Sequence, residues 1–139
     1  MITAVDTNVL LDVFGADEQF GIASREAIRR CRLEGCLVAC EVVWAETAAW
    51  FDSSGIFNEQ MDALEIAFSE ATREISVFAG SLWKDHLQHG GRRGRLVADF
   101  LIGAHARFQA DRLLTRDRGF YRTYFRQLTV LDPTARTCR

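Results

Sequence analysis

Short apolar runs alternate with longer amphipathic segments along this chain, and that alternation restricts its fold more than any other feature. A buried strand reads as an apolar run of about four to eight residues, whereas a helix repeats its apolar residues about every three or four positions. The runs that predict strands are residues 2–5, 36–40, 75–78, 112–115 and 128–131. The segments that predict helices are residues 18–34, 41–51, 57–70, 79–88 and 96–110. This order predicts an α/β fold, a three-layer α/β/α sandwich around a short parallel sheet.

Length and composition are typical of one soluble domain. A chain of 139 residues can bury a real core, so we expect a single domain over residues 1–139. No apolar run reaches the ~20 residues that cross a bilayer, and no secretory leader is recognisable, so we expect a cytoplasmic protein without a membrane partner. The cysteines, at positions 31, 36, 40 and 138, lack Cys-x-x-Cys spacing, which favours reduced structural thiols over a zinc site.

Four acidic residues lie in stretches that otherwise have the composition of a protein core. Asp6 ends the first apolar run, and Asp117 follows the run at 112–115. Glu46 is flanked by valine, alanine and tryptophan, and Asp99 interrupts an apolar helical segment. Burying an unpaired carboxylate costs several kcal/mol, so four such acids in a chain with one lysine indicate a bound divalent cation. Oxygen ligands suit Mg²⁺ or Mn²⁺.

The expected elements direct these acids towards one edge of the sheet. In open α/β folds the ligand crevice lies beyond the carboxyl ends of the strands, where Asp6 and Asp117 are expected. The residues one helical turn from Glu46 are apolar, so we expect Glu46 on a buried face. Gly103, one turn after Asp99, would let its helix approach a neighbour closely.

Taken singly, the same acids have ordinary explanations. Asp6 and Asp117 could each stabilise a turn through the side chain, and Asp99 could form an ion pair with Arg95 one turn earlier. Converging carboxylates repel one another, and a divalent ion removes that repulsion while all of them stay ionised. A bound divalent cation therefore explains the four positions together, and the number of ions, one or two, stays open.

The charges are unevenly distributed along the chain. Residues 1–89 contain 6 basic and 15 acidic residues, a net charge of −9, whereas residues 90–139 contain 11 and 4, a net charge of +7. All eleven C-terminal cations are arginine, whose planar fork suits bidentate contact with phosphate. The asymmetry favours a nucleic-acid partner, and a solvated basic face is the alternative.

Four short sequences, in order between residues 5 and 120, resemble the motifs of the PIN-domain family and, within it, of the VapC-type toxins of toxin–antitoxin pairs. They are Asp6-Thr7-Asn8-Val9-Leu10, Val42-Val43-Trp44-Ala45-Glu46, Asp99-Phe100-Leu101-Ile102-Gly103-Ala104-His105-Ala106 and Leu113-Leu114-Thr115-Arg116-Asp117-Arg118-Gly119-Phe120. A lone Asp-Thr-Asn would be a weak signal, but the ordered set is specific.

The resemblance implies a PIN-like fold and a metal-dependent endoribonuclease activity, in which Mg²⁺ or Mn²⁺ activates water to hydrolyse an RNA phosphodiester. It implies that the four acids are the catalytic residues and metal ligands: Asp6, Glu46, Asp99 and Asp117. Asn8 and Thr115 match polar residues that support the site. Candidate contacts to the RNA backbone precede Asp99 and are Arg92, Arg93 and Arg95.

A VapC-type toxin further implies protein partners. The family pairs with a VapB-type antitoxin, whose C-terminal segment lies along the toxin and blocks the site, and homodimers are usual. The Glu46 helix is apolar on two stripes, which predicts either burial on two sides or a groove for such a segment.

The chain departs from the family pattern where many relatives have serine or threonine at the start of this helix. Here Cys40-Glu41 stands instead, which weakens the N-cap and leaves open a supporting role for Glu41 near the site. Otherwise Glu41 and Asp12 are expected to have structural roles. Residues 53–94 carry no motif of the family.

Three other functions compete with a toxin ribonuclease. A PIN nuclease that matures rRNA or mRNA needs no antitoxin, but the compact length favours the toxin. A non-catalytic RNA-binding PIN domain would lack one or more of the acids, and all four are present. A phosphoryl-accepting receiver domain needs a lysine after a late strand, and the one lysine, Lys84, is not so placed.

Overall fold

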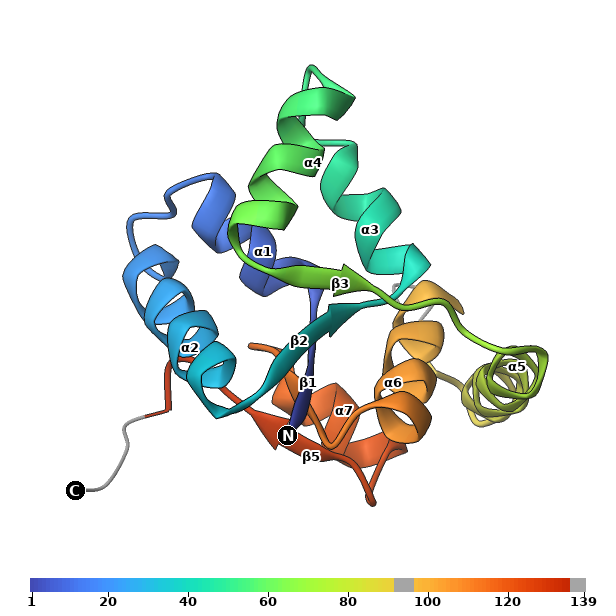
Figure 1. Cartoon of the computed structure of the whole chain (residues 1–139). Helices are drawn as coiled ribbons and strands as arrows, with labels where there is room; N and C mark the ends of the chain where they lie inside the picture. Colours follow the sequence, from blue (N-terminus) through green and yellow to red (C-terminus); the bar gives the residue numbers. More distant parts are fainter. Residues whose placement is uncertain (92–96, 136–139) are drawn as a thin grey trace.

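A computed structural model describes residues 1–91 and 97–135, which form a parallel sheet between helical layers (Figure 1). The strands are β1 (Ile2–Val5), β2 (Cys36–Ala39), β3 (Ile66–Phe68), β4 (Arg112–Leu114) and β5 (Thr129–Leu131). The helices are α1 (Thr7–Phe14), α2 (Gly21–Glu34), α3 (Glu41–Ala48), α4 (Ser54–Ala63), α5 (Arg73–Gln88), α6 (Val97–Gln109) and α7 (Arg118–Tyr124). The α/β/α fold expected from the alternation is confirmed.

The sheet reverses its strand order beside β1. The order is β3-β2-β1-β4-β5, and every pairing is parallel. The chain therefore moves outward from β1 to β3 and then crosses back to place β4 on the other side of β1. In open α/β sheets the crevice beyond the carboxyl ends of the strands at such a reversal is the usual ligand site. The two segments that meet there follow β1 and β4.

Helices cover the sheet on both sides. In Figure 1, α2 lies on one side of the strands, and α6 lies on the other with α5 outside it. Edge-on ring contacts join α6 to α7 through Phe100, Phe120 and Tyr124, and His86 of α5 forms a hydrogen bond with the Tyr124 hydroxyl. Gly103 provides the expected close approach, because a Cβ there would lie 2.3 Å from the ring of Phe125. These contacts hold the helix of Asp99 firmly against its neighbours.

The middle of the chain differs from the sequence prediction. The predicted helix over 57–70 ends early, because α4 stops at Ala63 and Glu65 adopts a positive φ of 57°. The third strand is β3 and not residues 75–78, which lie inside α5. The Thr72 side chain caps α5 by accepting a hydrogen bond from the Ile75 amide, a start signal that outweighs the β propensity of the following residues. The sequence reading also missed α1 and α7.

Other expectations concern the membrane and the thiols. Within residues 1–91 and 97–135, no helix combines the length and the apolar character needed to cross a membrane. Cys31, Cys36 and Cys40 are free thiols, and Cys138 lies outside the described residues.

Candidate active site

Asp6 lies at the junction of β1 and α1, directly at the reversal of strand order. The register aligns Val5 with Leu114, and the Asp6 amide continues this pairing by donating to the Leu114 carbonyl at 3.0 Å. The Asp6 backbone stays extended, with φ −81° and ψ 154°, and its Oδ1 accepts a hydrogen bond from the Thr7 amide at 2.7 Å. Asp6 is therefore the N-cap of α1, and this cap fixes the direction of its carboxylate.

The second carboxylate oxygen of Asp6 is held by side chains. Thr115 Oγ1 donates to Asp6 Oδ2 at 2.7 Å, and Asn8 Nδ2 donates to the same oxygen at 3.2 Å. Thr115 Oγ1 in turn accepts from the Asp117 amide at 3.0 Å, so one hydroxyl ties the Asp6 carboxylate to the start of the next acidic segment. The Tyr121 hydroxyl also hydrogen-bonds to Asp6. Asp6 is only 5% exposed.

Three of the acids, Asp6, Asp99 and Asp117, influence the pKa of the same buried tyrosine, Tyr121. Burial raises the pKa of Asp6 from 3.8 to about 6; the hydrogen bonds from Thr115, Thr7 and Tyr121 oppose this rise, and the charge of Asp99 adds to it. Burial also raises the pKa of Tyr121 well above its ordinary value, and the charges of Asp6, Asp99 and Asp117 raise it further. The charges of these three carboxylates therefore all act on one buried hydroxyl, that of Tyr121.

Glu46 reaches this region from α3, although not as expected. The prediction that Glu46 faces the core is wrong, because Val43 and Thr47 take the buried positions and Glu46 is exposed. Its Oε1 accepts a hydrogen bond from Thr7 Oγ1 at 2.9 Å. The Thr7 amide is bonded to Asp6, so Thr7 connects Glu46 with Asp6.

Asp99 and Asp117 lie at helix N-termini and are half-buried. Asp99 is in the first turn of α6, and Asp117 precedes α7. The premise that all four carboxylates are buried therefore holds for Asp6 alone. Water can reach the other three, which lowers the cost of keeping them ionised. The alternative pairing of Asp99 with Arg95, and the candidate RNA contacts Arg92 and Arg93, lie outside the described residues.

Asp12 has the structural role expected of it. This 4%-exposed carboxylate forms a bidentate ion pair with Arg116, at 2.7 and 2.9 Å, and accepts a hydrogen bond from Ser24 Oγ at 2.8 Å. The pair joins the segment after β4 to α1, and the Ser24 hydrogen bond joins it to α2.

Glu41 is directed towards the connection between β3 and α5. Its carboxylate accepts hydrogen bonds from the Ala71 amide at 3.0 and 3.3 Å. Cys40, the N-cap residue of α3, makes no side-chain cap, as its replacement of serine or threonine predicts. Glu41 therefore orders a neighbouring loop.

The donor set of the site fits a hard divalent cation. Asp6 and Asp99 carry oxygen atoms of the kind that such an ion prefers; burial raises the pKa of Asp6, and the charge of Asp99 adds to that rise. Among the described residues, no three or more His, Cys, Asp and Glu side chains form a cluster that could hold a metal ion. Mg²⁺ does not require such a cage, because it is usually bound through one or two carboxylates and keeps several waters. A pair of carboxylates such as Asp6 and Asp99 is compatible with this mode of binding.

Two residues at the site were missed by the sequence reading. Tyr121 lies one helical turn after Asp117, but α7 was not predicted, so nothing directed attention to it. Thr7 is the central residue of the Asp-Thr-Asn sequence, and its hydroxyl contact with Glu46 depends on how α1 and α3 pack.

The raised pKa of Asp6 predicts a pH dependence of stability. Because the folded pKa of about 6 exceeds the unfolded value of 3.8, the unfolded chain loses this proton first as the pH rises. The free energy of unfolding should therefore fall between about pH 4 and pH 6, by about 3 kcal/mol at about 1.36 kcal/mol per pKa unit. Asp6→Asn carries no charge, so its unfolding free energy should lack this decline. Urea unfolding of both proteins in EDTA from pH 4 to pH 7 measures the difference, and parallel curves would contradict it.

Comparison with known proteins places this geometry in a family. The chain matches the family model described as PIN domain over residues 3–126, which include all four acids. Comparison with curated proteins gives no match.

Several solved structures share the fold. The structure of VapBC2 from Rickettsia felis, bound to a DNA fragment from its promoter, superposes on this chain with a TM-score of 0.71. The two sequences are 17% identical, and the match covers 95% of this chain and 98% of that one. VapBC-1 from nontypeable Haemophilus influenzae gives 0.70 at 19% identity, with coverages of 97% and 100%. FitAcB from Neisseria gonorrhoeae gives 0.66 at 19% identity, with coverages of 96% and 98%. Since the family model matches most of the sequence, this chain belongs to the PIN-domain family.

Proposed function

We propose that this protein is a Mg²⁺-dependent endoribonuclease, the toxin of a type II toxin–antitoxin pair that a cognate antitoxin neutralises. The observation that carries the proposal is the state of Asp6. Its carboxylate is buried, oriented by Thr115, Asn8 and the Thr7 amide, and destabilised by the nearby charge of Asp99. A carboxylate that is both costly to ionise and rigidly aimed is suited to binding a cation rather than to stabilising the fold.

The four acids would have different roles at this site. Asp6 and Asp99 would hold Mg²⁺, with Mn²⁺ as a possible substitute, and Asp117 and Glu46 would contribute directly or through water. When bound, the ion lowers the pKa of water and offsets the charge that develops on the phosphodiester. Thr115 and Asn8 would keep the Asp6 carboxylate in one orientation, which lowers the cost of organising the site.

RNA is the proposed substrate class. The net charge of +7 over residues 90–139, carried by arginine, favours a phosphate backbone, and the family resemblance supplies the endonucleolytic reaction. Arg92, Arg93 and Arg95 remain proposed backbone contacts, because they directly precede α6 in the sequence.

Removing the metal tests the enzymatic part of this proposal. Purified protein should cleave structured RNA with Mg²⁺ or Mn²⁺ and stop in EDTA. Mg²⁺ at about 100 times its dissociation constant should also add about 2.7 kcal/mol to the free energy of unfolding, since it binds the folded state. Asp6→Asn should lose both effects. Cleavage that persists in EDTA would refute metal dependence, and binding of RNA without cleavage under any metal would favour the non-catalytic alternative.

An apolar hollow supports the antitoxin part. It lies among α1, α2, α4 and the segment after α3 and has a volume of about 350 Å³. Its apolar lining includes Phe14, Phe51 and Ile56, and Arg25 and Gln60 add polar groups. Ile56 is 53% exposed and Trp50, nearby in sequence, is 75% exposed. The sequence left two interpretations of the Glu46 helix: burial on two sides, or a groove for a partner segment. Burial on two sides is wrong for Trp50, because its side chain is exposed. Large exposed apolar side chains beside a hollow suit an apolar segment of a partner.

Expression in bacteria tests the toxin assignment. Induction of this chain should arrest growth, and co-expression of the small open reading frame beside its gene should restore growth. Ile56→Glu in the hollow should abolish that rescue while RNA cleavage persists. If the neighbouring product neither binds nor rescues, the RNA-maturation nuclease becomes the better reading. The proposed homodimer is measured by the sedimentation of the purified protein alone.

A further inference from the structure

Arg116 stands between two residues of the candidate active site. Thr115, directly before it, donates a hydrogen bond to the Asp6 carboxylate, and Asp117, directly after it, is one of the four acids. Residues 115–117 join β4 to α7 and belong to neither a strand nor a helix. The order of such a connection depends on the contacts that it makes with neighbouring elements. What holds Arg116 therefore bears on both of its neighbours.

The guanidinium group of Arg116 attaches this connection to α1. Its Nε and Nη2 donate to the two carboxylate oxygens of Asp12 at 2.7 and 2.9 Å. Two parallel bonds of this kind fix orientation as well as distance. The guanidinium also lies over the ring of Phe20, and Ser24 Oγ donates to Asp12 at 2.8 Å. The carboxylate that binds Arg116 is therefore itself held in place.

The backbone of Arg116 is attached to the same helix. Its amide donates to Asn8 Oδ1 at 3.2 Å, and Asn8 Nδ2 donates to Asp6 and to Thr115, each at 3.2 Å. Asn8 and Asp12 are four residues apart on α1, so backbone and side chain contact the same face of that helix. The bond from the Arg116 amide is neutral, whereas each bond to Asp12 is charge-assisted and roughly twice as strong. The ion pair is therefore the stronger of the two attachments.

We propose that Arg116 is a positioning residue of the active site, which acts through its ion pair with Asp12. The pair would hold residues 115–117 at one place along α1 and so keep Thr115 and Asp117 in position relative to Asp6. The inference rests on the proposed function, in which Asp6 and Asp117 bind the cation and Thr115 orients Asp6. Groups that orient metal ligands in this way contribute to metal affinity without touching the ion.

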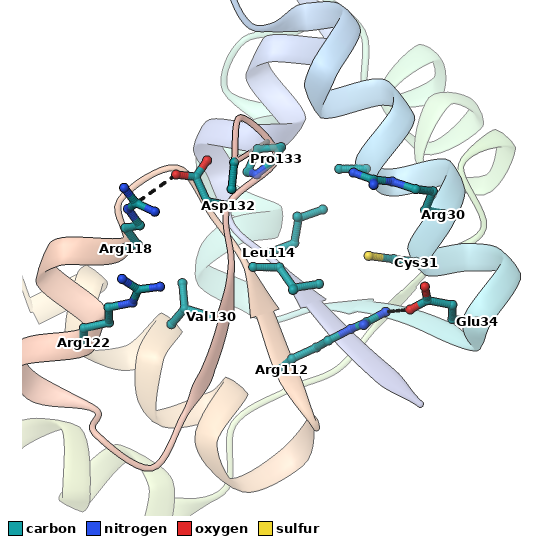
Figure 2. A pocket seen from close by; sticks show the side chains of 13 residues that line it. Arg30, Cys31, Glu34, Arg112, Leu114, Arg118, Arg122, Val130, Asp132 and Pro133 are labelled. Atoms are coloured by element: carbon teal, nitrogen blue, oxygen red, sulfur yellow. Dashed lines mark hydrogen bonds and ion pairs between the residues drawn. The ribbon is translucent and has the colours of Figure 1, made fainter. Parts of the chain in front are cut away.

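Arg112 offers a matched control at the other end of β4. It is 9% exposed, pairs with Glu34 on α2 and donates to Thr3 Oγ1 at 2.9 Å. Figure 2 shows its side chain reaching from β4 to Glu34. Arg112 begins the strand, whereas Arg116 follows its carboxyl end. Arg112→Met therefore breaks an arginine–carboxylate pair of the same strand without altering residues 115–117.

The first test needs no metal. In EDTA, the amides of residues 116 and 117 should exchange hydrogen about tenfold faster in Arg116→Met than in Arg112→Met, as followed by NMR. These amides donate to Asn8 and to Thr115, so their exchange reports on the connection itself. Rates are taken relative to the amide of Ser69, which donates to the Ala39 carbonyl beside the opposite edge of the sheet. Equal relative rates in the two variants overturn the inference.

Calorimetric titration with Mg²⁺, without RNA, tests the consequence for the site. Arg116→Met should raise the Mg²⁺ dissociation constant about tenfold, the lower end for changing a group that orients a metal ligand. Arg112→Met should leave the constant within about twofold of the wild type. Asp12→Asn in the Arg116→Met background removes the unpaired charge, but it should bind Mg²⁺ as weakly as Arg116→Met, because the ion pair is still absent. Recovery of the wild-type constant in this double variant would show a role in stability alone and overturn the inference.

Failure of the proposed function would look different. It would appear as a wild-type protein that binds no Mg²⁺ and cleaves no RNA. The exchange rates at residues 116 and 117 are measured in EDTA, so they decide in that case as well whether Arg116 holds the connection in place.

Discussion

Asp99→Asn is expected to lower the rate of RNA cleavage at least about a hundredfold. Changing a residue that only orients a metal ligand typically costs about 10–100-fold, so removing the charge of a ligand should cost at least the upper value. Burial raises the pKa of Asp6, and the charge of Asp99 adds to this rise, so the two carboxylates interact electrostatically. An amide keeps the shape of the side chain but attracts a cation far less. Single-turnover cleavage of a structured RNA at saturating Mg²⁺ measures the effect.

Stability distinguishes this result from a folding defect. Asp99→Asn should still unfold cooperatively in urea, because the amide keeps the shape of the side chain. Glu41→Gln is the informative control, because Glu41 is also an acid at a helix N-terminus but bonds to the Ala71 amide. It should retain cleavage within a few-fold of the wild type. Full activity of Asp99→Asn, or an equal loss of activity in Glu41→Gln, would refute the proposal that Asp99 is a metal ligand.

Arg116→Met is expected to lower the free energy of unfolding by about 3 kcal/mol, the lower end of the range for breaking a buried ion pair. Asp12 is 4% exposed and would keep only the hydrogen bond from Ser24. Arg116 also stacks over the ring of Phe20, with 4.1 Å from Cζ to the ring centre, so methionine loses that contact as well. The Arg116 side chain is 29% exposed, which is why the lower value is expected. Equilibrium urea unfolding at pH 7 measures the change.

A second substitution shows whether the lost stability comes from the unpaired charge. Asp12→Asn in the Arg116→Met background removes that charge and should recover more than half of the loss. Arg29→Met is the matched surface control, because Arg29 and Glu26 are both more than half exposed. Its effect should stay below about 0.5 kcal/mol. A loss below about 1 kcal/mol in Arg116→Met would show that Asp12 does not depend on its partner.

The strands and helices that the sequence predicted correctly have strong local signals. β1, β2, β4 and β5 are apolar runs bounded by polar residues or glycine, and α2 and α6 repeat their apolar residues with the helical period. The elements that were missed are short or lie in ambiguous apolar stretches. Thr7–Phe14 and Arg118–Tyr124 span only two turns or so, and their helical state depends on packing more than on propensity.

Glu46 shows that helical periodicity alone does not predict which face of a short helix is buried. Its neighbours at helical spacing are apolar, which predicted a buried face, yet α3 ends at Ala48 and leaves Trp50 outside the helix and exposed. A short helix can bury one stripe and leave another open, and the sequence does not say which. The contact of Glu46 with Thr7 arises from the way that α3 packs against α1.

The sequence alone determined the fold class, because alternating apolar periods are a local pattern, and it named four acids as candidate site residues. The tertiary structure decided how those acids differ. Parallel pairing of β1 with β4 places Thr115 against Asp6, so one carboxylate is buried and hydrogen-bonded while three remain partly or fully in water. Desolvation and charge coupling depend on distances between residues far apart in the chain, and those distances exist only after folding.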